Sequence, residues 1–553
     1  MDKKFIISYK VNGTTVVSTQ TDNVMYTLDI VDTPERFTVK LNPKRDFELV
    51  DFRVEFPYPF INGDRFFANG YQSWTKTREF KADEVMKGVI KLSHITEYVK
   101  HYASLTSDEK IVSYSEKPGE FHSHCYTYVR NGEKVKLWGS LCDKTGYTYY
   151  KVKMNENYFA YCKDVAGKMV TAPLDIFDIV YFEGTYEEVF DKFFSLFDMP
   201  ATRKGAMSGY TSWYNYFQNI TEDIILRDLN GLDFAKDDVS IFQIDDGYEP
   251  FVGDWLDPCP KKFPNGMKYI ADKIHEKGYK AGIWLAPFSC QKVSRVAKEH
   301  PDWLIKTEKG KPQLGCIAWG GAYTLDFYNE GAREYIKHVF DVVINEWGYD
   351  MVKLDFLYSE CLTPRHGKSR GEIMHEAMAF LRECVGDKLL LGCGIPMSAA
   401  LGVCDACRIS CDVDLTYKGK IYNHIHVANE MLSAQSAINN SIFRRHLNGR
   451  AFMNDPDVFF LRNNNLKFTL EQKKLLAKIN NLCGNVLFVS DNAGDYDEEQ
   501  RALLRKYLKK TNEKILAAEY VNETVIKLVI DDNSVEKEFV FDLKTGEVIK
   551  GEL

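Results

Sequence analysis

The sequence predicts a multidomain α/β protein, in which a central (β/α)8 barrel (TIM barrel) lies between an N-terminal β-sandwich and a small C-terminal antiparallel β domain. Short β-rich runs separated by turn residues fill the first 185 residues. From about residue 205, strand-like runs alternate with helical stretches, and after about residue 511 the pattern returns to β. The chain has 553 residues, 45% of them hydrophobic, which gives ample core for several such units.

Residues 1–185 are expected to form the sandwich, because no helical period interrupts their β-rich runs. The clearest of these runs are residues 13–31, 35–41, 47–56 and 135–141. A linker helix is expected over residues 186–204, where apolar side chains recur at helical spacing and a proline follows. These apolar side chains are Val189, Phe190, Phe193, Phe194 and Phe197.

The barrel is expected over residues 205–510. Eight strand-like runs occur there, at residues 208–217, 239–248, 280–288, 350–358, 388–396, 406–414, 449–457 and 485–492. Helical stretches such as residues 267–278 and 331–348 separate most of them, as a (β/α)8 barrel of this length requires. Residues 511–553 are expected to form the C-terminal β domain.

Charge and composition exclude several classes of function. The formal net charge is −8 and the isoelectric point about 5.9, so no electrostatic argument favours nucleic acid or an anionic membrane as partner. The N-terminus alternates like a strand rather than a signal peptide, and no apolar run is long enough to span a bilayer. The 13 cysteines are interpreted as reduced, which predicts a cytoplasmic protein.

One cysteine cluster leaves two interpretations open. Cys404, Cys407 and Cys411 lie close together, and a single C-x-x-C could be half a metal site or a redox pair. No second C-x-x-C and no histidine pair with finger-like spacing accompanies it. We therefore favour packed free thiols and expect neither a metal nor a cofactor.

Polar and aromatic residues gather at the carboxyl ends of the predicted barrel strands, where the active sites of such barrels lie. The candidates at these strand ends are Trp213, Tyr214, Asp245, Asp246, Trp284, Lys353, Asp355, Cys393, Arg408 and Asp412. Singly, each has a structural alternative: the aspartates could belong to a turn, the tryptophans to barrel packing, and Arg408 with Asp412 to an ion pair.

The run "MVKLDFLY" at residues 351–358 places a cation and a carboxylate on one face of a buried strand. Side chains alternate along a strand, so Lys353 and Asp355 share a face opposite the apolar one. The lysine is expected to keep Asp355 ionised, as a nucleophile requires. Two carboxyls and tryptophan faces around one mouth are typical of a retaining glycosidase, in which one carboxylate attacks and the other transfers protons. Extra carboxylates such as Asp245 and Asp246 could accept hydrogen bonds from sugar hydroxyls.

Several of these segments resemble glycoside hydrolase family 36, the α-galactosidases, over nearly the whole chain. "KLDF" at 353–356 is similar to the family's nucleophile motif, and "RISCD" at 408–412 resembles its Arg-x-x-x-Asp pattern. The resemblance implies that Asp355 is the nucleophile, that Asp412 is the acid/base and that Arg408 orients it or contacts substrate. Asp405 and Asp414 lie nearby in the sequence and leave open whether Asp414 shares the acid/base role.

Three further segments carry the resemblance. "NGYQSW" at 69–74 is similar to the sandwich segment whose tryptophan, here Trp74, reaches into the pocket. "DDGY" at 245–248 resembles the segment that holds the galactose 4- and 6-hydroxyls, and "GCG" at 392–394, with Cys393, resembles the segment near the 2-hydroxyl. The glycine-rich stretch and Ser-Asp-Asn-Thr-Asp motif of the larger members are replaced by a region that fits the compact bacterial members better.

The resemblance implies a cytoplasmic, retaining α-galactosidase that hydrolyses small galactosides such as melibiose or raffinose without a metal or cofactor. The expected partner is this small-molecule substrate, and assembly into a homo-oligomer is left open. Three alternatives stay open: an α-N-acetylgalactosaminidase, a raffinose-synthase-like transglycosylase, and a non-catalytic galactoside-binding protein on the same scaffold.

Overall fold

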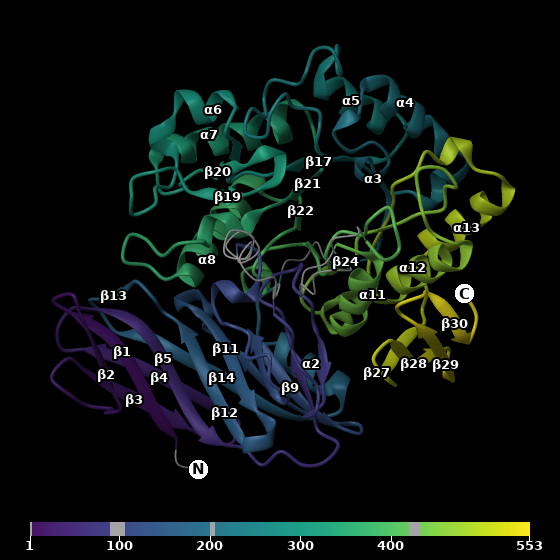
Figure 1. Ribbon diagram of the computed structural model, residues 1–553. Coiled ribbons are helices and arrows are strands. Elements are labelled where there is room, and N and C mark those ends of the chain that lie inside the picture. The colour runs from purple at the N-terminus through teal and green to yellow at the C-terminus, as the bar shows by residue number, and fades with distance from the viewer. Residues whose placement is uncertain (1–2, 89–104, 200–204, 420–431) are drawn as a thin grey trace, which may run out of the picture.

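The computed structural model describes residues 3–88, 105–199, 205–419 and 432–553. It shows three parts: two antiparallel sheets built from the N-terminal residues, a curled parallel sheet with its helices above them, and a small C-terminal sheet beside the last helices (Figure 1). The parallel sheet with flanking β domains is the barrel-like architecture that the sequence predicts.

The sandwich consists of two seven-stranded sheets. Side chains alternate inward and outward along its strands, and Leu49, Phe52 and Val54 of one central strand are fully buried. The first sheet contains β1 (Lys4–Val11), β2 (Thr14–Ser18), β5 (Phe47–Pro57), β8 (Glu120–His124), β11 (Tyr147–Lys153), β12 (Tyr158–Asp164) and β13 (Lys168–Val170). The second contains β3 (Tyr26–Asp32), β4 (Arg36–Pro43), β6 (Arg65–Ala68), β7 (Arg78–Phe80), β9 (Tyr126–Asn131), β10 (Lys134–Ser140) and β14 (Leu174–Gly184).

The central sheet is parallel and has nine strands in the order β24-β23-β22-β21-β17-β16-β15-β26-β25. Each of the eight predicted runs contributes one strand, and a two-residue strand, β25, is added. The strands are β15 (Met207–Thr211), β16 (Ile241–Ile244), β17 (Lys280–Leu285), β21 (Met351–Leu354), β22 (Leu389–Gly392), β23 (Ala406–Arg408), β24 (Met453–Asp455), β25 (Val458–Phe459) and β26 (Val486–Val489). They are shorter than the predicted runs, so the residues after each strand belong to loops.

Helices cover the outside of the parallel sheet (Figure 1). The helices are α3 (Trp213–Tyr216), α4 (Glu222–Gly231), α5 (Gly266–Glu276), α6 (Arg295–Glu299), α7 (Glu330–Asp341), α8 (Arg370–Val385), α9 (Met397–Ala400), α11 (Ala434–Phe443), α12 (Leu470–Cys483) and α13 (Glu498–Leu508). A small sheet of β18 (Ser289–Gln291), β19 (Leu314–Cys316) and β20 (Ala322–Thr324) is inserted between β17 and α7. Within the described residues, no helix is both long and apolar enough to cross a membrane.

The predicted linker helix is shorter than expected. Helix α2 spans Tyr186–Phe194 and begins at Thr185, whose side chain forms a capping box with Glu188. Phe197 therefore lies beyond the helix, and residues 200–204 of the predicted linker lie outside the described residues. The buried face of α2 packs on the sandwich and on the end of α11, as the ring stacking of Phe190 on His446 shows, with centroids 3.9 Å apart.

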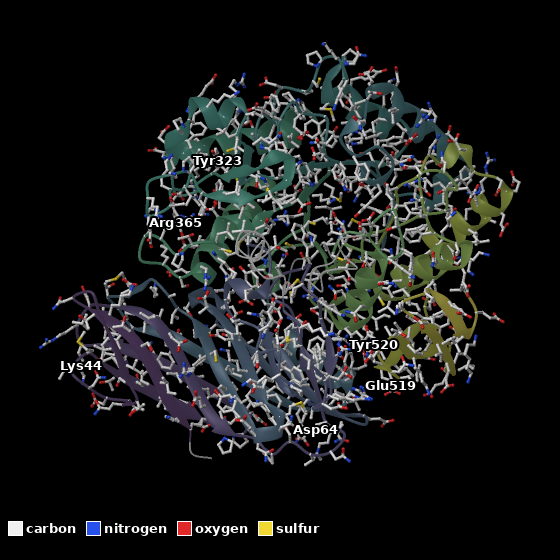
Figure 2. All side chains as sticks on the ribbon, viewed as in Figure 1. Lys44, Asp64, Tyr323, Arg365, Glu519 and Tyr520 are labelled. Carbon is white, nitrogen blue, oxygen red and sulfur yellow. The ribbon has the colours of Figure 1, made fainter. Side chains whose placement is uncertain are left out.

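The C-terminal sheet, β27 (Lys514–Tyr520), β28 (Val525–Asp532), β29 (Val535–Asp542) and β30 (Glu547–Lys550), is antiparallel. Glu519 and Tyr520 at the end of β27 face the rest of the molecule (Figure 2). Glu519 forms a 3.0 Å ion pair with Arg65 of the sandwich, and the Tyr520 hydroxyl donates to Asn439 of α11 at 2.7 Å. The C-terminal sheet thus contacts both other parts of the fold.

All 13 cysteines are free thiols, as predicted. Cys404, Cys407 and Cys411 are buried, and burial raises the pKa of each. Protonated buried thiols behave as small apolar side chains, which agrees with their interpretation as core residues.

Candidate active site

A cavity of about 530 Å³ opens at the carboxyl ends of the parallel strands. Its volume is in the range of sites that bind small molecules. The residues that line it are Trp74, Trp213, Phe217, Gln218, Asn219, Asp245, Asp246, Trp284, Ala318, Trp319, Lys353, Asp355, Phe356, Asp412 and Leu432. The structure therefore brings most of the sequence-predicted site residues together, and Tyr214, Cys393 and Arg408 are the three that do not line the cavity.

Asp355 lies at the bottom of the cavity, directly after strand β21, and is only 9% exposed. Its carboxylate accepts two hydrogen bonds, from the indole N–H of Trp284 at 3.2 Å and from the backbone N–H of Phe356 at 2.8 Å. Burial raises the pKa of Asp355, Lys353 lowers it, and Asp412 raises it again, so that the net direction is upward. The two hydrogen bonds also lower the pKa and fix the carboxylate in one orientation.

Lys353 does not form an ion pair with Asp355. The Nζ of Lys353 instead lies 2.9 Å from Oδ2 of Asp245, at the end of the neighbouring strand but one. Burial lowers the pKa of Lys353, but the attraction of Asp245 outweighs it and the net direction is upward. Lys353 and Asp355 both line the cavity. Lys353 acts on Asp355 through its charge alone.

Asp412 also lines the cavity and is more exposed than Asp355, with 37% of its side chain accessible to solvent. Arg408 donates to its Oδ1 at 2.7 Å. The ion pair that the sequence left open as an alternative for these two residues is therefore present. Arg408 is itself buried and also contacts Asp455 at 3.1 Å and Asp457 at 2.9 Å. One arginine thereby fixes the orientation of three carboxylates, only one of which reaches the cavity.

Tyr214 and Cys393 lie behind the cavity wall instead of in it. Strand β15 ends at Thr211 and the short helix α3 follows, so Trp213 points into the cavity while Tyr214 turns to the core and donates to Asp457. Cys393 is fully buried, and its backbone N–H donates to Leu354 of the neighbouring strand at 2.8 Å. The family resemblance implies that Cys393 lies near the sugar 2-hydroxyl. Cys393 does not line this cavity, so the structure does not support that position.

Two other aspartates near Asp412 in the sequence do not line the cavity. Asp405 pairs with Arg382 at 2.8 Å, and Oδ1 of Asp414 accepts the backbone N–H of Leu415 at 2.6 Å. Asp412 is thus the aspartate of this segment that the fold directs into the cavity.

Gln218 and Trp319 are cavity residues that the sequence reasoning missed, and both bind Asp246. The Gln218 amide donates to both Asp246 oxygens at 3.1 Å, and the Trp319 indole N–H donates to Oδ2 at 2.8 Å. Burial raises the pKa of Asp246, while hydrogen bonds from Glu249, Gln218 and Trp319 lower it. Both residues come from loops, where strand alternation gives no signal.

Three aromatic residues of the cavity have left-handed backbone conformations. Phe217, Trp319 and Phe356 have φ angles of 49°, 55° and 54°. For bulky residues this region costs about 1–3 kcal/mol each and is typical of functional sites. At Phe356 this conformation follows directly on Asp355, whose carboxylate accepts the Phe356 N–H.

Trp74 reaches the cavity from the sandwich. Arg444, fully buried at the end of α11, donates to the carbonyls of Ser73 at 2.6 Å, Gln72 at 3.0 Å and Gly70 at 3.2 Å. The Ser73 N–H donates to Ile395 at 3.0 Å, which fixes the segment to the loop after β22. Among the described residues, the buried indole N–H of Trp74 has no hydrogen-bond partner.

Comparisons with known proteins agree with this architecture. Residues 215–382 match a family model described as Melibiase. A type A blood α-D-galactosamine galactosaminidase from Flavonifractor plautii is 30% identical over 199 residues, and the match covers 32% of this chain but only 18% of that protein. The chain thus spans a small part of the length of this relative.

Solved α-galactosidases share the whole fold. TtGalA from Thermus thermophilus, solved with p-nitrophenyl α-D-galactopyranoside, superposes with a TM-score of 0.71 at 23% identity over 96% of this chain and 98% of that one. The family 36 α-galactosidase AgaA from Geobacillus stearothermophilus superposes with a TM-score of 0.57 at 11% identity over 96% of this chain and 78% of that one. Residues 215–382 are therefore similar to the Melibiase family, and the chain shares its fold with solved α-galactosidases.

Proposed function

We propose that this chain is a retaining α-galactosidase, which removes terminal α-galactosyl residues from small galactosides of the melibiose or raffinose type by double displacement. The observation that carries the proposal is the cavity itself, which gathers Asp355, Asp412 and several tryptophans at the carboxyl ends of the parallel strands. We infer that this sheet works as a (β/α)8 barrel, whose active sites lie at that end.

The two carboxyls have different surroundings, which suits two different roles. Asp355 is buried, which raises its pKa, but its two N–H donors and the positive charge of Lys353 favour the ionised form that a nucleophile needs. Asp412 is more exposed and oriented by Arg408, where it can exchange protons with the leaving group and with water.

In the first step, Asp355 forms a bond to the anomeric carbon while the bond from that carbon to the leaving oxygen breaks. Asp412 donates its proton to the leaving oxygen. In the second step, Asp412 takes a proton from water, the water oxygen bonds to the anomeric carbon, and the bond to Asp355 breaks. Two inversions give net retention.

The sugar hydroxyls would be held by the remaining polar groups of the cavity. Asp245 and Asp246 present carboxylate oxygens, and the unpartnered indole N–H of Trp74 is a donor. The faces of Trp213 and Trp284 offer apolar surface for the sugar ring. The cytoplasmic location and any homo-oligomer stay predictions.

The test compares an aryl α-galactoside with the corresponding aryl α-N-acetylgalactosaminide, using wild type, Asp355→Ala and Asp412→Asn. We expect turnover of the galactoside, abolished by the first substitution and reduced about 10²- to 10⁴-fold by the second. Asp414→Asn is the matched control, because Asp414 does not line the cavity. The first sugar product, followed by NMR before it mutarotates, should be the α-anomer.

Other results would change the proposal in defined ways. Turnover of the acetylated sugar alone would keep the mechanism and make the chain an α-N-acetylgalactosaminidase. Preferential transfer to an added sugar would make it a transglycosylase. Tight galactose binding with no turnover by folded protein would refute the enzyme and leave a galactoside-binding protein.

A further inference from the structure

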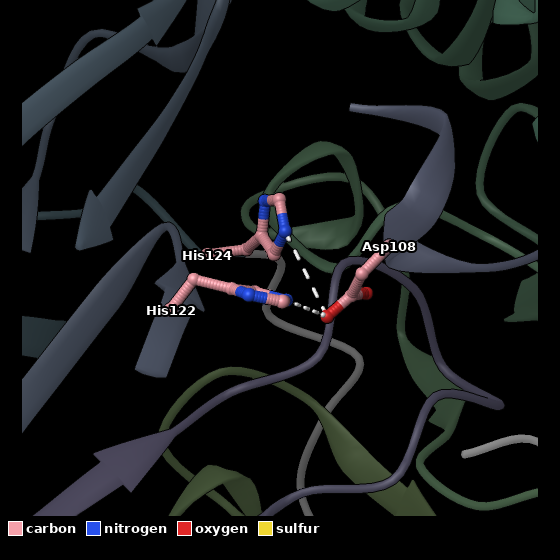
Figure 3. Close-up of side chains that lie close together, drawn as sticks. All are labelled: Asp108, His122 and His124. Atoms are coloured by element: carbon pink, nitrogen blue, oxygen red, sulfur yellow. Dashed lines mark hydrogen bonds and ion pairs between the residues drawn. The ribbon is translucent and has the colours of Figure 1, made fainter. Parts of the chain in front are cut away.

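Three buried side chains of the sandwich converge outside the candidate active site: Asp108, His122 and His124 (Figure 3). The two histidines lie two residues apart on β8, so both project from the same face of the strand. Asp108 approaches them from the start of a short 3₁₀ helix, Asp108–Lys110. One ligand-capable atom of each residue lies within 4.8 Å of those of the other two, and all three residues are buried, at most 3% exposed.

Asp108 is the centre of the cluster. Its Oδ2 lies 3.0 Å from Nε2 of His122 and 3.8 Å from Nε2 of His124, while its Oδ1 accepts the backbone N–H of Tyr71 at 2.7 Å. Asp108 thus links the two imidazole rings to the backbone of Tyr71.

His124 is the unusual member. Neither of its ring nitrogens has a hydrogen-bond partner in the described part of the chain, although the side chain is buried. Unsatisfied buried polar groups are costly and rare in native proteins, so the His124 ring points to a missing partner.

We propose that Asp108, His122 and His124 bind one divalent metal ion of the zinc class, with water in the fourth position. Two imidazoles and a carboxylate are a typical donor set for zinc, whereas calcium and magnesium prefer oxygen donors alone. Metal–ligand bonds of about 2.0–2.2 Å around a tetrahedral ion separate its ligands by about 3.4 Å. The distances of 3.0 and 3.8 Å from Asp108 to the two rings lie on either side of this value.

The surroundings offer an entry path for an ion. A cavity of about 400 Å³ is lined by His122, with both acidic side chains (Glu55, Glu120) and basic ones (Arg53, Lys151, Lys153), and so reaches the cluster from the surface. On the far side, Asp108 holds the backbone of Tyr71, three residues before Trp74. An ion at this cluster therefore tightens the segment that carries Trp74 into the candidate active site.

The experiment measures zinc binding directly and does not depend on the proposed activity. Protein treated with a chelator and then dialysed is titrated with Zn²⁺ by calorimetry, and its metal content is measured by mass spectrometry. We expect one ion per chain and a higher unfolding temperature with Zn²⁺ than with chelator. Co²⁺ in place of Zn²⁺ should give the visible absorption of a tetrahedral site with nitrogen and oxygen donors.

Variants assign the ion to this cluster. We expect His124→Ala and Asp108→Asn to weaken Zn²⁺ binding at least about 100-fold. His275→Ala is the matched control, because His275 forms a single 2.9 Å pair with Asp350 on the surface and should leave binding unchanged. If a variant fails to fold, the Co²⁺ spectrum of the wild type still decides the issue. A wild type without a bound ion, or undiminished binding by a folded His124→Ala, would overturn the proposal.

Discussion

The buried ion pair between Lys353 and Asp245 gives the sharpest prediction for the folded state. Both residues are less than 10% exposed, and their charged atoms lie 2.9 Å apart. Lys353→Met keeps the length and the apolar stem of the side chain but removes its charge. Asp245 is then left as a buried carboxylate without a cation.

The expected loss of stability follows from the geometry. At 2.9 Å, and with an effective dielectric constant of about 20, the attraction between the two charges is about 6 kcal/mol. Three other donors partly compensate Asp245: Gln243 at 2.8 Å, Thr211 at 3.3 Å and the N–H of Asp246 at 3.0 Å. Removing one member of a buried pair typically costs about 3–5 kcal/mol, and with these donors we expect about 3 kcal/mol.

Chemical unfolding followed by tryptophan fluorescence measures this loss. The double variant Lys353→Met/Asp245→Asn removes both charges, so it should recover at least half of what the single variant loses. A single variant that loses less than about 1 kcal/mol, or a double variant that is no more stable than the single one, would refute the reasoning.

The same substitution separates the structural role of Lys353 from its effect on catalysis. The positive charge of Lys353 lowers the pKa of Asp355, whereas burial and Asp412 raise it. The nucleophile must be ionised, so activity falls as the pH drops through this pKa. In Lys353→Met the acid limb of kcat/KM should therefore move to higher pH. It should stay there in the double variant, because Asp245→Asn restores stability but no positive charge.

Two further predictions test the wall of the cavity. Burial raises the pKa of Asp457 to about 7, so its contribution to stability is full below the unfolded pKa and is lost as the pH rises through 7. Asp457→Asn should therefore gain stability relative to wild type between pH 5 and 8, and calorimetry that shows a pH-independent difference would contradict this. Gly394 has a φ of +55°, and an added Cβ would lie 2.9 Å from the indole of Trp74. Gly394→Ala should lower kcat/KM about 10- to 100-fold. Gly132→Ala is the control: its φ is +59°, an added Cβ there meets no atom within 4 Å, and only stability should fall. Equal activity of the two variants would show that the position of Trp74 is unimportant.

Local sequence patterns were sufficient for the architecture. The alternation of strand-like and helical runs predicts the parallel sheet, because each run of a few apolar residues can only be buried as a strand between covering helices. Strand ends then indicate where the site lies. Asp245, Asp355 and Asp412 come from three different strands, yet all three line one cavity.

What local patterns could not predict are contacts that depend on where a strand stops. Strand β21 ends at Leu354, one residue before Asp355, so Asp355 belongs to the following loop, and strand alternation does not give the hydrogen bonds or ion pairs of either residue. The true partner of Lys353 is 108 positions away in sequence. Tyr214 fails for the same reason, because helix α3 replaces the expected strand and turns it away from the cavity.

The dependence of the cavity on two parts of the fold follows from Arg444. This residue is fully buried without a carboxylate partner among its hydrogen bonds, and it donates instead to backbone carbonyls on both sides of the interface: Ser73 and Gly70 in the sandwich, Ile409 in the barrel-like sheet. Burial lowers its pKa to about 10, which still leaves it charged at neutral pH. Because a charged guanidinium cannot stay buried without these acceptors, the segment that carries Trp74 is held against the cavity as firmly as the sheet itself. The sandwich is therefore a structural part of the candidate active site.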